Sequence, residues 1–260
     1  MRKETALDSN QDYVLETAGL AKEFRGFVAV AGVDLRIRRG HIHALIGPNG
    51  AGKTTCFNLL TKFLTPTRGT IRFNGVDITA EPPARIARQG IVRSFQISAV
   101  FPHLTVLENV RIALQRQLGL SFHFWRPSRV LDQLNDRAMA LLAEMGLEGS
   151  AGMIAMELPY GRKRALEIAT TLALEPELML LDEPTQGMGH EDVERVMALI
   201  RKVAQGRTIL MVEHNMKVVS GICDRITVLA RGAVLAEGDY ATVANDPRVV
   251  EAYMGGAGGQ

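Results

Sequence analysis

The sequence predicts an α/β fold with a mainly parallel sheet, a β-rich part at the front of the chain and an inserted helical part. Three observations predict it. Short apolar segments alternate with helix-like ones, one apolar segment runs directly into a glycine-rich loop, and a helical stretch interrupts the alternation. Strands that alternate with helices favour a mainly parallel sheet covered on both faces.

The front of the chain is rich in predicted strands. Residues 33–37 alternate apolar and polar side chains, as a half-buried strand does, and residues 41–46 form a strand that leads into the glycine-rich loop. A helix is expected over 54–63, and residues 70–76 return to strand and turn. His41 and His43 lie on one face of their strand, but without a third ligand a structural role is favoured over a metal site.

Helices dominate the middle of the chain. Thr105 and Glu108 have the spacing of a capping box, which predicts a helix that begins there. A second helix is expected over about 129–145, with Gly146 as its C-terminal stop. The helical part therefore spans roughly 98–174.

Strand and helix alternation then resumes. A strand is expected over 178–181, a helix over 191–203 and a further strand over 208–212. We therefore expect one domain over 13–254 with flexible ends. Its parts are a core lobe at 13–97 and 175–254, a helical lobe at about 98–174, and ends at 1–12 and 255–260.

Composition limits the classes of function. The 30 basic and 28 acidic residues leave a net charge of +2, which argues against a nucleic-acid binder with a concentrated basic face. No stretch approaches 18 uninterrupted apolar residues, and the polar N-terminus lacks the apolar segment of a secretory signal, so a cytosolic chain is expected. Cys56 and Cys223 are interpreted as two reduced thiols.

The glycine-rich loop matches the phosphate-binding pattern of Gly, four residues and Gly-Lys-Thr, between a strand and a helix. Glycines let successive backbone N–H groups cradle phosphates, and the helix start adds the positive end of its dipole. Lys53 is expected to contact the β- and γ-phosphates, Thr54 to ligate Mg²⁺ and Thr55 to reach the α-phosphate. The nucleotide-binding residues of this loop are Gly47, Pro48, Asn49, Gly50, Ala51, Gly52, Lys53, Thr54 and Thr55.

Two carboxylates end an apolar strand. Asp182 and Glu183 follow residues 178–181, at the carboxyl end of a strand, where open α/β sheets bind ligands. In a protein with a phosphate-binding loop, Asp182 is placed to hold Mg²⁺ and Glu183 to polarise the attacking water.

Together these segments resemble the ATP-binding cassette (ABC) ATPase family, over nearly the whole chain. The resemblance implies a phosphate-loop NTPase fold with an antiparallel β subdomain and an inserted helical subdomain, and it implies ATP and Mg²⁺ as ligands. It places Gln96 at the family's glutamine loop, His214 at its switch histidine and Phe24, with Phe27 as a rival, at the aromatic that stacks on adenine.

The resemblance also places residues 158–164 at the family signature, which caps the ATP held by another subunit. Gly161 is retained there, whereas Pro159 and Tyr160 replace the usual serine and first glycine. Gly189 stands where the family's D-loop usually has Asp.

The resemblance thus implies a division of roles between two subunits. Catalysis is assigned to Glu183, His214, Gln96 and Lys53. Metal binding is assigned to Thr54, Gln96 and Asp182, and Gly161 is expected to contact the nucleotide in trans.

Finer features resemble the branched-chain amino acid importer subfamily, namely residues 26–30, 158–161 and 245–255 and the long helical insert. The partners implied are a second ABC ATPase subunit, identical or paralogous, two transmembrane permease subunits and, indirectly, a periplasmic solute-binding protein. The expected location is the cytoplasmic face of the inner membrane. Alternatives are an ATPase of lipopolysaccharide-type export, a non-transport ABC ATPase, and a cassette that binds ATP without hydrolysing it.

Overall fold

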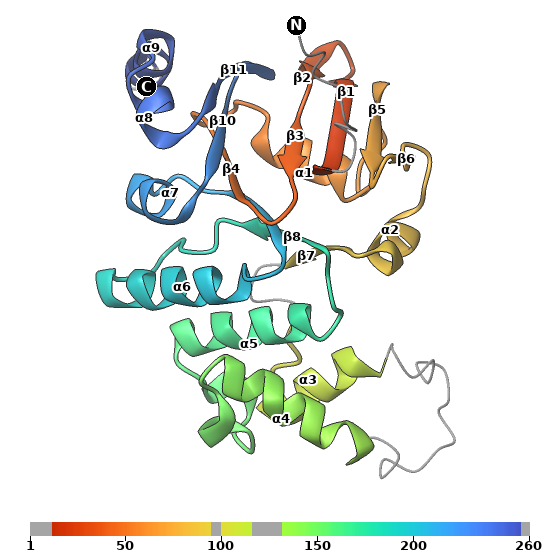
Figure 1. Ribbon diagram of the computed structural model, residues 1–260, viewed down its shortest axis with the longest axis vertical. Helices are drawn as coiled ribbons and strands as arrows, with labels where there is room; N and C mark the ends of the chain where they lie inside the picture. The colour runs from red at the N-terminus through yellow and green to blue at the C-terminus, as the bar shows by residue number, and fades with distance from the viewer. Residues whose placement is uncertain (1–11, 95–99, 116–131, 256–260) are drawn as a thin grey trace, which may run out of the picture.

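The computed structural model describes residues 12–94, 100–115 and 132–255 (Figure 1). A six-stranded sheet lies beside a smaller antiparallel sheet, and a group of helices lies below both in this view. The ends expected to be flexible fall outside the described residues, except for Asp12 and Gly255. Within the described part, no helix is both long and apolar enough to cross a membrane.

The larger sheet is mainly parallel, as predicted. Only its edge pair, β10 with β11, is antiparallel, while every other neighbouring pair runs in parallel. In spatial order the strands are β11 (Ala233–Gly238), β10 (Arg225–Ala230), β4 (Ile42–Ile46), β9 (Thr208–Val212), β8 (Leu178–Asp182) and β7 (Ile91–Ser94).

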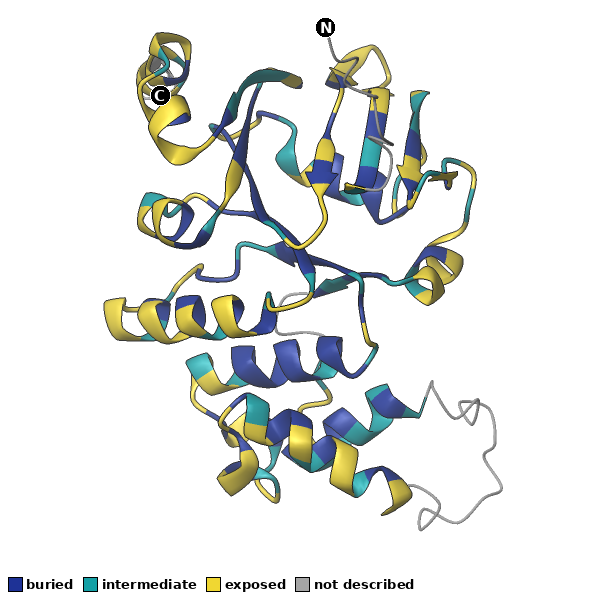
Figure 2. Ribbon diagram, viewed as in Figure 1, coloured by how far each residue is buried: buried dark blue, intermediate teal, exposed yellow. Residues whose placement is uncertain are grey.

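The central strands of this sheet carry apolar residues on both faces, and both faces are buried. Along β8, Met179 and Leu181 belong to one core with the helical part, whereas Leu178 and Leu180 belong to a second core with the antiparallel sheet. Figure 2 shows these strands as buried through most of their length. A parallel sheet covered on both sides needs such continuous apolar runs, which is why the strand at 178–181 could be predicted.

The antiparallel sheet occupies the front of the chain. Its central strand β1 pairs with β2, β3 and β5, and β5 continues into β6. The strands are β1 (Tyr13–Phe24), β2 (Phe27–Val33), β3 (Arg36–Arg38), β5 (Arg68–Phe73) and β6 (Val76–Asp77).

The single strand predicted over 33–37 is wrong, because β2 ends at Val33 and β3 begins at Arg36. The Thr17 side chain enters the ladder here: its Oγ1 donates to Val33 O at 2.9 Å and accepts from Leu35 N at 2.9 Å. The Asp34 carboxylate accepts from Gly19 N at 2.5 Å. Side-chain hydrogen bonds thus join the backbone bond from Thr17 N to Leu35 O at this point, and the alternating pattern of the sequence does not reveal them.

The helical part contains the predicted capping box. Thr105 caps α3 (Val106–Leu114) by accepting from Glu108 N at 3.1 Å, while Glu108 accepts from Thr105 N at 2.8 Å. The helix predicted over 129–145 is seen as α4 (Asn135–Glu144), although its first residues lie outside the described ranges. Gly146, with φ of 68°, follows the end of α4 in the left-handed conformation, as expected of a helix stop.

The remaining helices cover the sheets. In Figure 1, α5 lies between α6 and the pair α3 and α4, and Figure 2 shows that α5 is largely buried. The helix predicted over 54–63 ends earlier, at Leu60, because Lys62 adopts a left-handed φ of 62°. The bounds are α1 (Lys53–Leu60), α2 (Pro83–Gln89), α5 (Tyr160–Leu172), α6 (His190–Val203), α7 (Met216–Ile222), α8 (Tyr240–Ala244) and α9 (Pro247–Gly255), with 3₁₀ turns η3 (Glu148–Ser150) and η4 (Ala155–Glu157).

Candidate functional site

The glycine-rich loop joins the carboxyl end of β4 to the start of α1. Gly47, Gly50 and Gly52 have positive φ angles of 148°, 77° and 99°. At Gly47 a Cβ atom would lie 2.1 Å from Leu229 O, and at Gly52 it would lie 2.5 Å from Ala29 O. Glycine is therefore required at these two positions by close backbone approach as well as by conformation.

Lys53 folds back over this loop. Its Nζ donates to Gly47 O at 2.7 Å and to Pro48 O at 3.0 Å. Burial lowers the pKa of Lys53, and the Glu183 carboxylate opposes that shift. Thr54 is exposed and Thr55 half-buried at the start of α1.

The carboxylates at the end of β8 have different surroundings. Asp182 is nearly buried and forms an ion pair with Arg93 Nη2 from the neighbouring strand β7. Arg93 Nη1 also donates to Asn58 Oδ1 of α1 at 2.7 Å. Glu183 adopts a left-handed φ of 45°, and its N–H donates to Val212 O of β9 at 2.9 Å. A turn thus begins beside the end of β9 at the residue expected to polarise the attacking water.

His214 follows β9, next to the turn that begins at Glu183. Its side chain is 59% exposed, whereas the preceding carboxylate of Glu213 is fully buried. Glu213 accepts from Thr185 N at 3.2 Å, His214 N at 2.8 Å and Asn215 N at 3.0 Å, and the Thr185 hydroxyl donates to it as well. One buried carboxylate thus connects the chain after β8 with the chain after β9.

The signature segment forms the start of α5. Tyr160 is the first residue of this helix, and its hydroxyl donates to Gln186 O at 3.0 Å. Gly161 leaves little room for a side chain, because a Cβ atom there would lie 3.0 Å from Asp192 Oδ1 in the first turn of α6. Gly189 is the N-cap of α6 and His190 its first residue, one position before the helix start expected at 191.

Two aromatic candidates flank the tip of the β1–β2 hairpin. Phe24 is 40% exposed and Phe27 68% exposed, and the two residues pair across the hairpin. Lys22 Nζ lies 5.1 Å from the Phe24 ring centroid, so that ring already stands beside a cation. Both rings remain candidates for stacking. Gln96 lies outside the described residues.

The donor set at the loop suits magnesium. Thr54 offers a hydroxyl and Asp182 a carboxylate, which are the oxygen ligands that Mg²⁺ binds together with nucleotide phosphates. Among the described residues, no group of three or more His, Cys, Asp or Glu side chains could hold a metal on its own. His43 is buried, and its Nε2 lies 2.8 Å from Thr227 Oγ1, a structural contact in agreement with the role favoured from the sequence.

Sequence reasoning missed three residues near the loop: Arg93, Glu213 and Tyr253. A charged residue inside the apolar strand at 91–94 was a signal for Arg93. Tyr253 of α9 lies beside Gly47, and partial burial raises the pKa of its hydroxyl. A cavity of about 570 Å³ lies between the loop and α9, which shows that the C-terminal helix borders the phosphate-binding loop.

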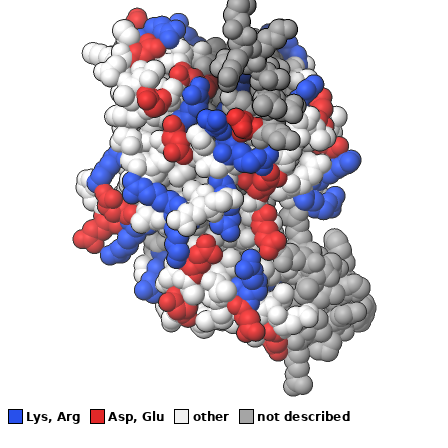
Figure 3. All heavy atoms as spheres, in the orientation of Figure 1, with Lys and Arg blue, Asp and Glu red and all other residues white. Residues whose placement is uncertain are grey.

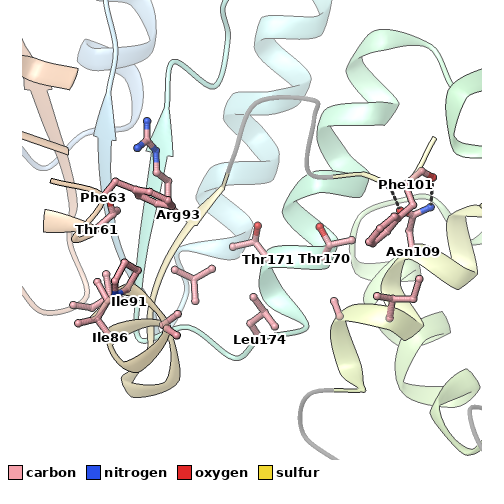
Figure 4. Close-up of a pocket in the computed structure, with 16 residues that line it drawn as sticks. Thr61, Phe63, Ile86, Ile91, Arg93, Phe101, Asn109, Thr170, Thr171 and Leu174 are labelled. Atoms are coloured by element: carbon pink, nitrogen blue, oxygen red, sulfur yellow. Dashed lines mark hydrogen bonds between the residues drawn. The ribbon is translucent and has the colours of Figure 1, made fainter. Parts of the chain in front are cut away.

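An apolar groove of about 430 Å³ separates the sheet from the helical part (Figure 4). One wall carries Phe63, Ile86 and Ile91, and the opposite wall carries Phe101 and Leu174. Phe63 and Phe101 are 54% and 52% exposed. On the molecular face in Figure 3, basic and acidic side chains are intermixed.

Comparisons with known proteins agree with this geometry. Residues 30–186 match the ABC transporter family, and residues 233–258 match the branched-chain amino acid ATP-binding cassette transporter family. The chain is 39% identical to the high-affinity branched-chain amino acid transport ATP-binding protein BraF of Pseudomonas aeruginosa, over 94% of this chain and 98% of that protein. It is 41% identical to the corresponding protein LivG of Escherichia coli K12, with the same coverage.

Solved structures agree as well. The ADP conformation of an ATP-binding cassette of an ABC transporter has a TM-score of 0.84 and 31% identity, covering 94% of this chain and 99% of that one. A nucleotide-free cassette has a TM-score of 0.82 and 29% identity, covering 93% and 98%. A dimeric bacterial ABC transporter cassette has a TM-score of 0.73 and 26% identity, covering 86% and 98%.

Three features occur here in one fold with cassette topology. They are the glycine loop with its lysine folded back over it, the two carboxylates at the end of β8, and the histidine after β9. Together with the family match and the relatives, they show that this chain belongs to the ATP-binding cassette family of transporter ATPases.

Proposed function

We propose that this chain hydrolyses MgATP as the nucleotide-binding subunit of a membrane importer for branched-chain amino acids or related small polar solutes. The observation that carries the chemistry is the arrangement of the strand ends. Strand β9 pairs with β4, which leads into the phosphate loop of Lys53, and also with β8, and Glu183 N donates to Val212 O of β9 at 2.9 Å. A cation for the phosphates and a carboxylate for the water thus share one site.

Each residue of the site has a distinct role. Backbone N–H groups of residues 47–55 cradle the phosphates, and Lys53 leaves its carbonyl partners to contact the β- and γ-phosphates. Thr54 and Asp182, with Gln96, hold Mg²⁺, which neutralises phosphate charge when it is bound. Phe24 stacks on the adenine.

Glu183 orients the attacking water and His214 contacts the γ-phosphate. The half-exposed His214 side chain is available for that contact, while its backbone is held by Glu213. Catalysis then rests on positioning and charge neutralisation rather than on a covalent intermediate.

The site is completed by a second cassette, identical or paralogous. The start of α5, with the backbone around Gly161, caps the nucleotide bound to the partner. A helix start offers unpaired N–H groups to a phosphate even though Pro159 lacks the usual serine hydroxyl. The existence of dimeric cassettes among the similar solved structures supports this arrangement.

The apolar groove of Figure 4 is the proposed contact with a transmembrane permease subunit at the cytoplasmic face of the membrane. Half-exposed Phe63 and Phe101 are suited to bury an apolar helix. The groove lies between the sheet and the helical part, so a movement of these two parts relative to each other would be passed on to a permease helix bound there. The substrate class rests on the printed names of the relatives and on the match over residues 233–258. A periplasmic solute-binding protein is the expected indirect partner.

The test is reconstitution of the chain with the membrane subunits and partner cassette that co-purify with it. We expect ATP-dependent uptake of leucine, isoleucine or valine into vesicles, coupled to phosphate release. Lys53→Ala removes the charge at the phosphates and should abolish both activities.

Phosphate release without uptake of these amino acids would reject the proposed substrate class. Movement of a lipid-linked glycan in the opposite direction would support the export alternative. Failure of the wild-type chain to bind adenine nucleotide would reject the proposed function altogether.

A further inference from the structure

One turn of the chain contacts two segments that are proposed to act on different nucleotides. Residues 183–187 begin directly after β8 and form a compact turn, in which Gln186 N donates to Glu183 O at 3.1 Å. One side of this turn contacts the segment of His214, and the other side contacts the start of α5.

The first contact is the buried carboxylate of Glu213. It receives four donors, two from Thr185 and one each from the backbones of His214 and Asn215. Among the described residues no lysine or arginine forms an ion pair with this carboxylate, and the His214 Nδ1 atom lies 3.9 Å away, so hydrogen bonds compensate its burial. Such an arrangement holds the backbone before His214 in a fixed relation to Thr185.

The second contact is the hydroxyl of Tyr160, which donates to Gln186 O at 3.0 Å. Tyr160 stands where the family signature usually has glycine, and glycine could not make this bond. Its neighbour Gly161 is the residue expected to face the nucleotide of the partner subunit. The departure from the family pattern therefore adds a link inside one chain.

We propose that Glu213 and Tyr160 are positioning residues that hold the 183–187 turn as a link between His214 of one nucleotide site and Gly161 of the other. This inference rests on the proposed two-site function. Contact of His214 with a γ-phosphate would shift Thr185 through Glu213, and the same turn would shift the start of α5 through Tyr160. Occupation of one site is thereby coupled to closure of the other.

The variants separate this link from the chemistry. Tyr160→Phe removes one hydroxyl from a side chain that is 45% exposed, so the fold should survive. Glu213→Gln keeps the size of the side chain but replaces one accepting oxygen with an amide donor, so it can no longer receive all four donors. Tyr240→Phe is the matched control, since Tyr240 of α8 is 39% exposed and lies outside the site.

The experiment has two readouts, one on the isolated chain and one on the complete transporter. One is the affinity of the isolated chain for a fluorescent ATP analogue, which reports a single site. The other is phosphate release by the assembled transporter as a function of ATP concentration. A two-site wild type should approach a Hill coefficient of about 2, the number of coupled sites.

We expect both variants to keep the affinity of the isolated chain within about twofold, and to lower the Hill coefficient towards 1. Turnover should fall roughly fivefold in each single variant. Because both residues act on one turn, the double variant should be no slower than the slower single variant. Tyr240→Phe should match the wild type.

Several outcomes would overturn the inference. An unchanged Hill coefficient in Tyr160→Phe would do so, as would additive losses in the double variant. If Glu213→Gln fails to fold, Tyr160→Phe alone decides. If the wild type hydrolyses ATP and the variants match it in turnover and Hill coefficient, only this link is rejected. If the wild type does not hydrolyse ATP, the proposed function itself is rejected.

Discussion

Arg93 and Asp182 form an ion pair between the adjacent parallel strands β7 and β8, with side chains that are 13% and 14% exposed. The same guanidinium reaches Asn58 on the helix that follows the phosphate loop and lies 5.8 Å from the Phe57 ring centroid. The carboxylate proposed to bind magnesium is thus already neutralised by a cation of the chain itself.

Replacing Arg93 should make the protein depend on its ligand for stability. Arg93→Gln leaves the Asp182 carboxylate nearly buried without its ion-pair partner, a change that typically costs about 3–5 kcal/mol of unfolding free energy. MgATP should restore more stability to the variant than it adds to the wild type, because Mg²⁺ then supplies the missing positive charge. Thermal unfolding with and without MgATP measures this, and equal increases in Tm would contradict it.

Glu183→Gln should separate nucleotide binding from hydrolysis. The amide keeps the size of the side chain but cannot polarise water, so we expect turnover to fall at least about a hundredfold. ATP binding should persist and trap a closed dimer of cassettes. Size-exclusion chromatography in MgATP, with its partner cassette present, would reveal the dimer, and normal turnover in this variant would exclude Glu183 from its role.

Gly47→Ala should damage the phosphate loop through crowding. The new Cβ would lie 2.1 Å from Leu229 O, so the loop or β10 must move. Gly50→Ala is a matched control for stability, since Gly50 also has a positive φ, of 77°, but no atom within 4 Å of the added Cβ. We expect the control to lose about 1–2 kcal/mol and Gly47→Ala clearly more. Similar urea midpoints for the two variants would contradict this explanation.

Acid should destabilise the protein through His43. Burial, and to a lesser degree the charges of Arg225 and His41, lowers the pKa of this imidazole from 6.5 to about 3. As pH falls below 6.5 the unfolded chain binds a proton that the folded chain does not, so the unfolding free energy decreases. By pH 5 the loss should be about 2 kcal/mol.

Urea unfolding at pH 7 and pH 5 measures this effect. His43→Asn should show a flatter dependence on pH, while the exposed His103→Asn should keep the wild-type dependence. An identical slope in all three proteins would assign the acid sensitivity to other groups.

Local patterns were enough to predict much of this protein. The phosphate loop, the carboxylates after β8, the capping box at Thr105 and the helix stop at Gly146 each depend on residues a few positions apart. Their backbone conformation and hydrogen bonds are decided within one turn or one strand, so the sequence alone determined them. The mainly parallel sheet followed from the alternation of apolar strands with helices.

Contacts between distant segments were decided only by the tertiary structure. The pairing of Arg93 with Asp182, the bonds from Thr185 to Glu213 and the bond from Tyr160 to Gln186 join residues 26 to 89 positions apart. The break at Asp34 has the same origin, since Thr17 of another strand enters the ladder. Such contacts depend on how sheets and helices pack, and the spacing of residues along one segment holds no information about its neighbours in space.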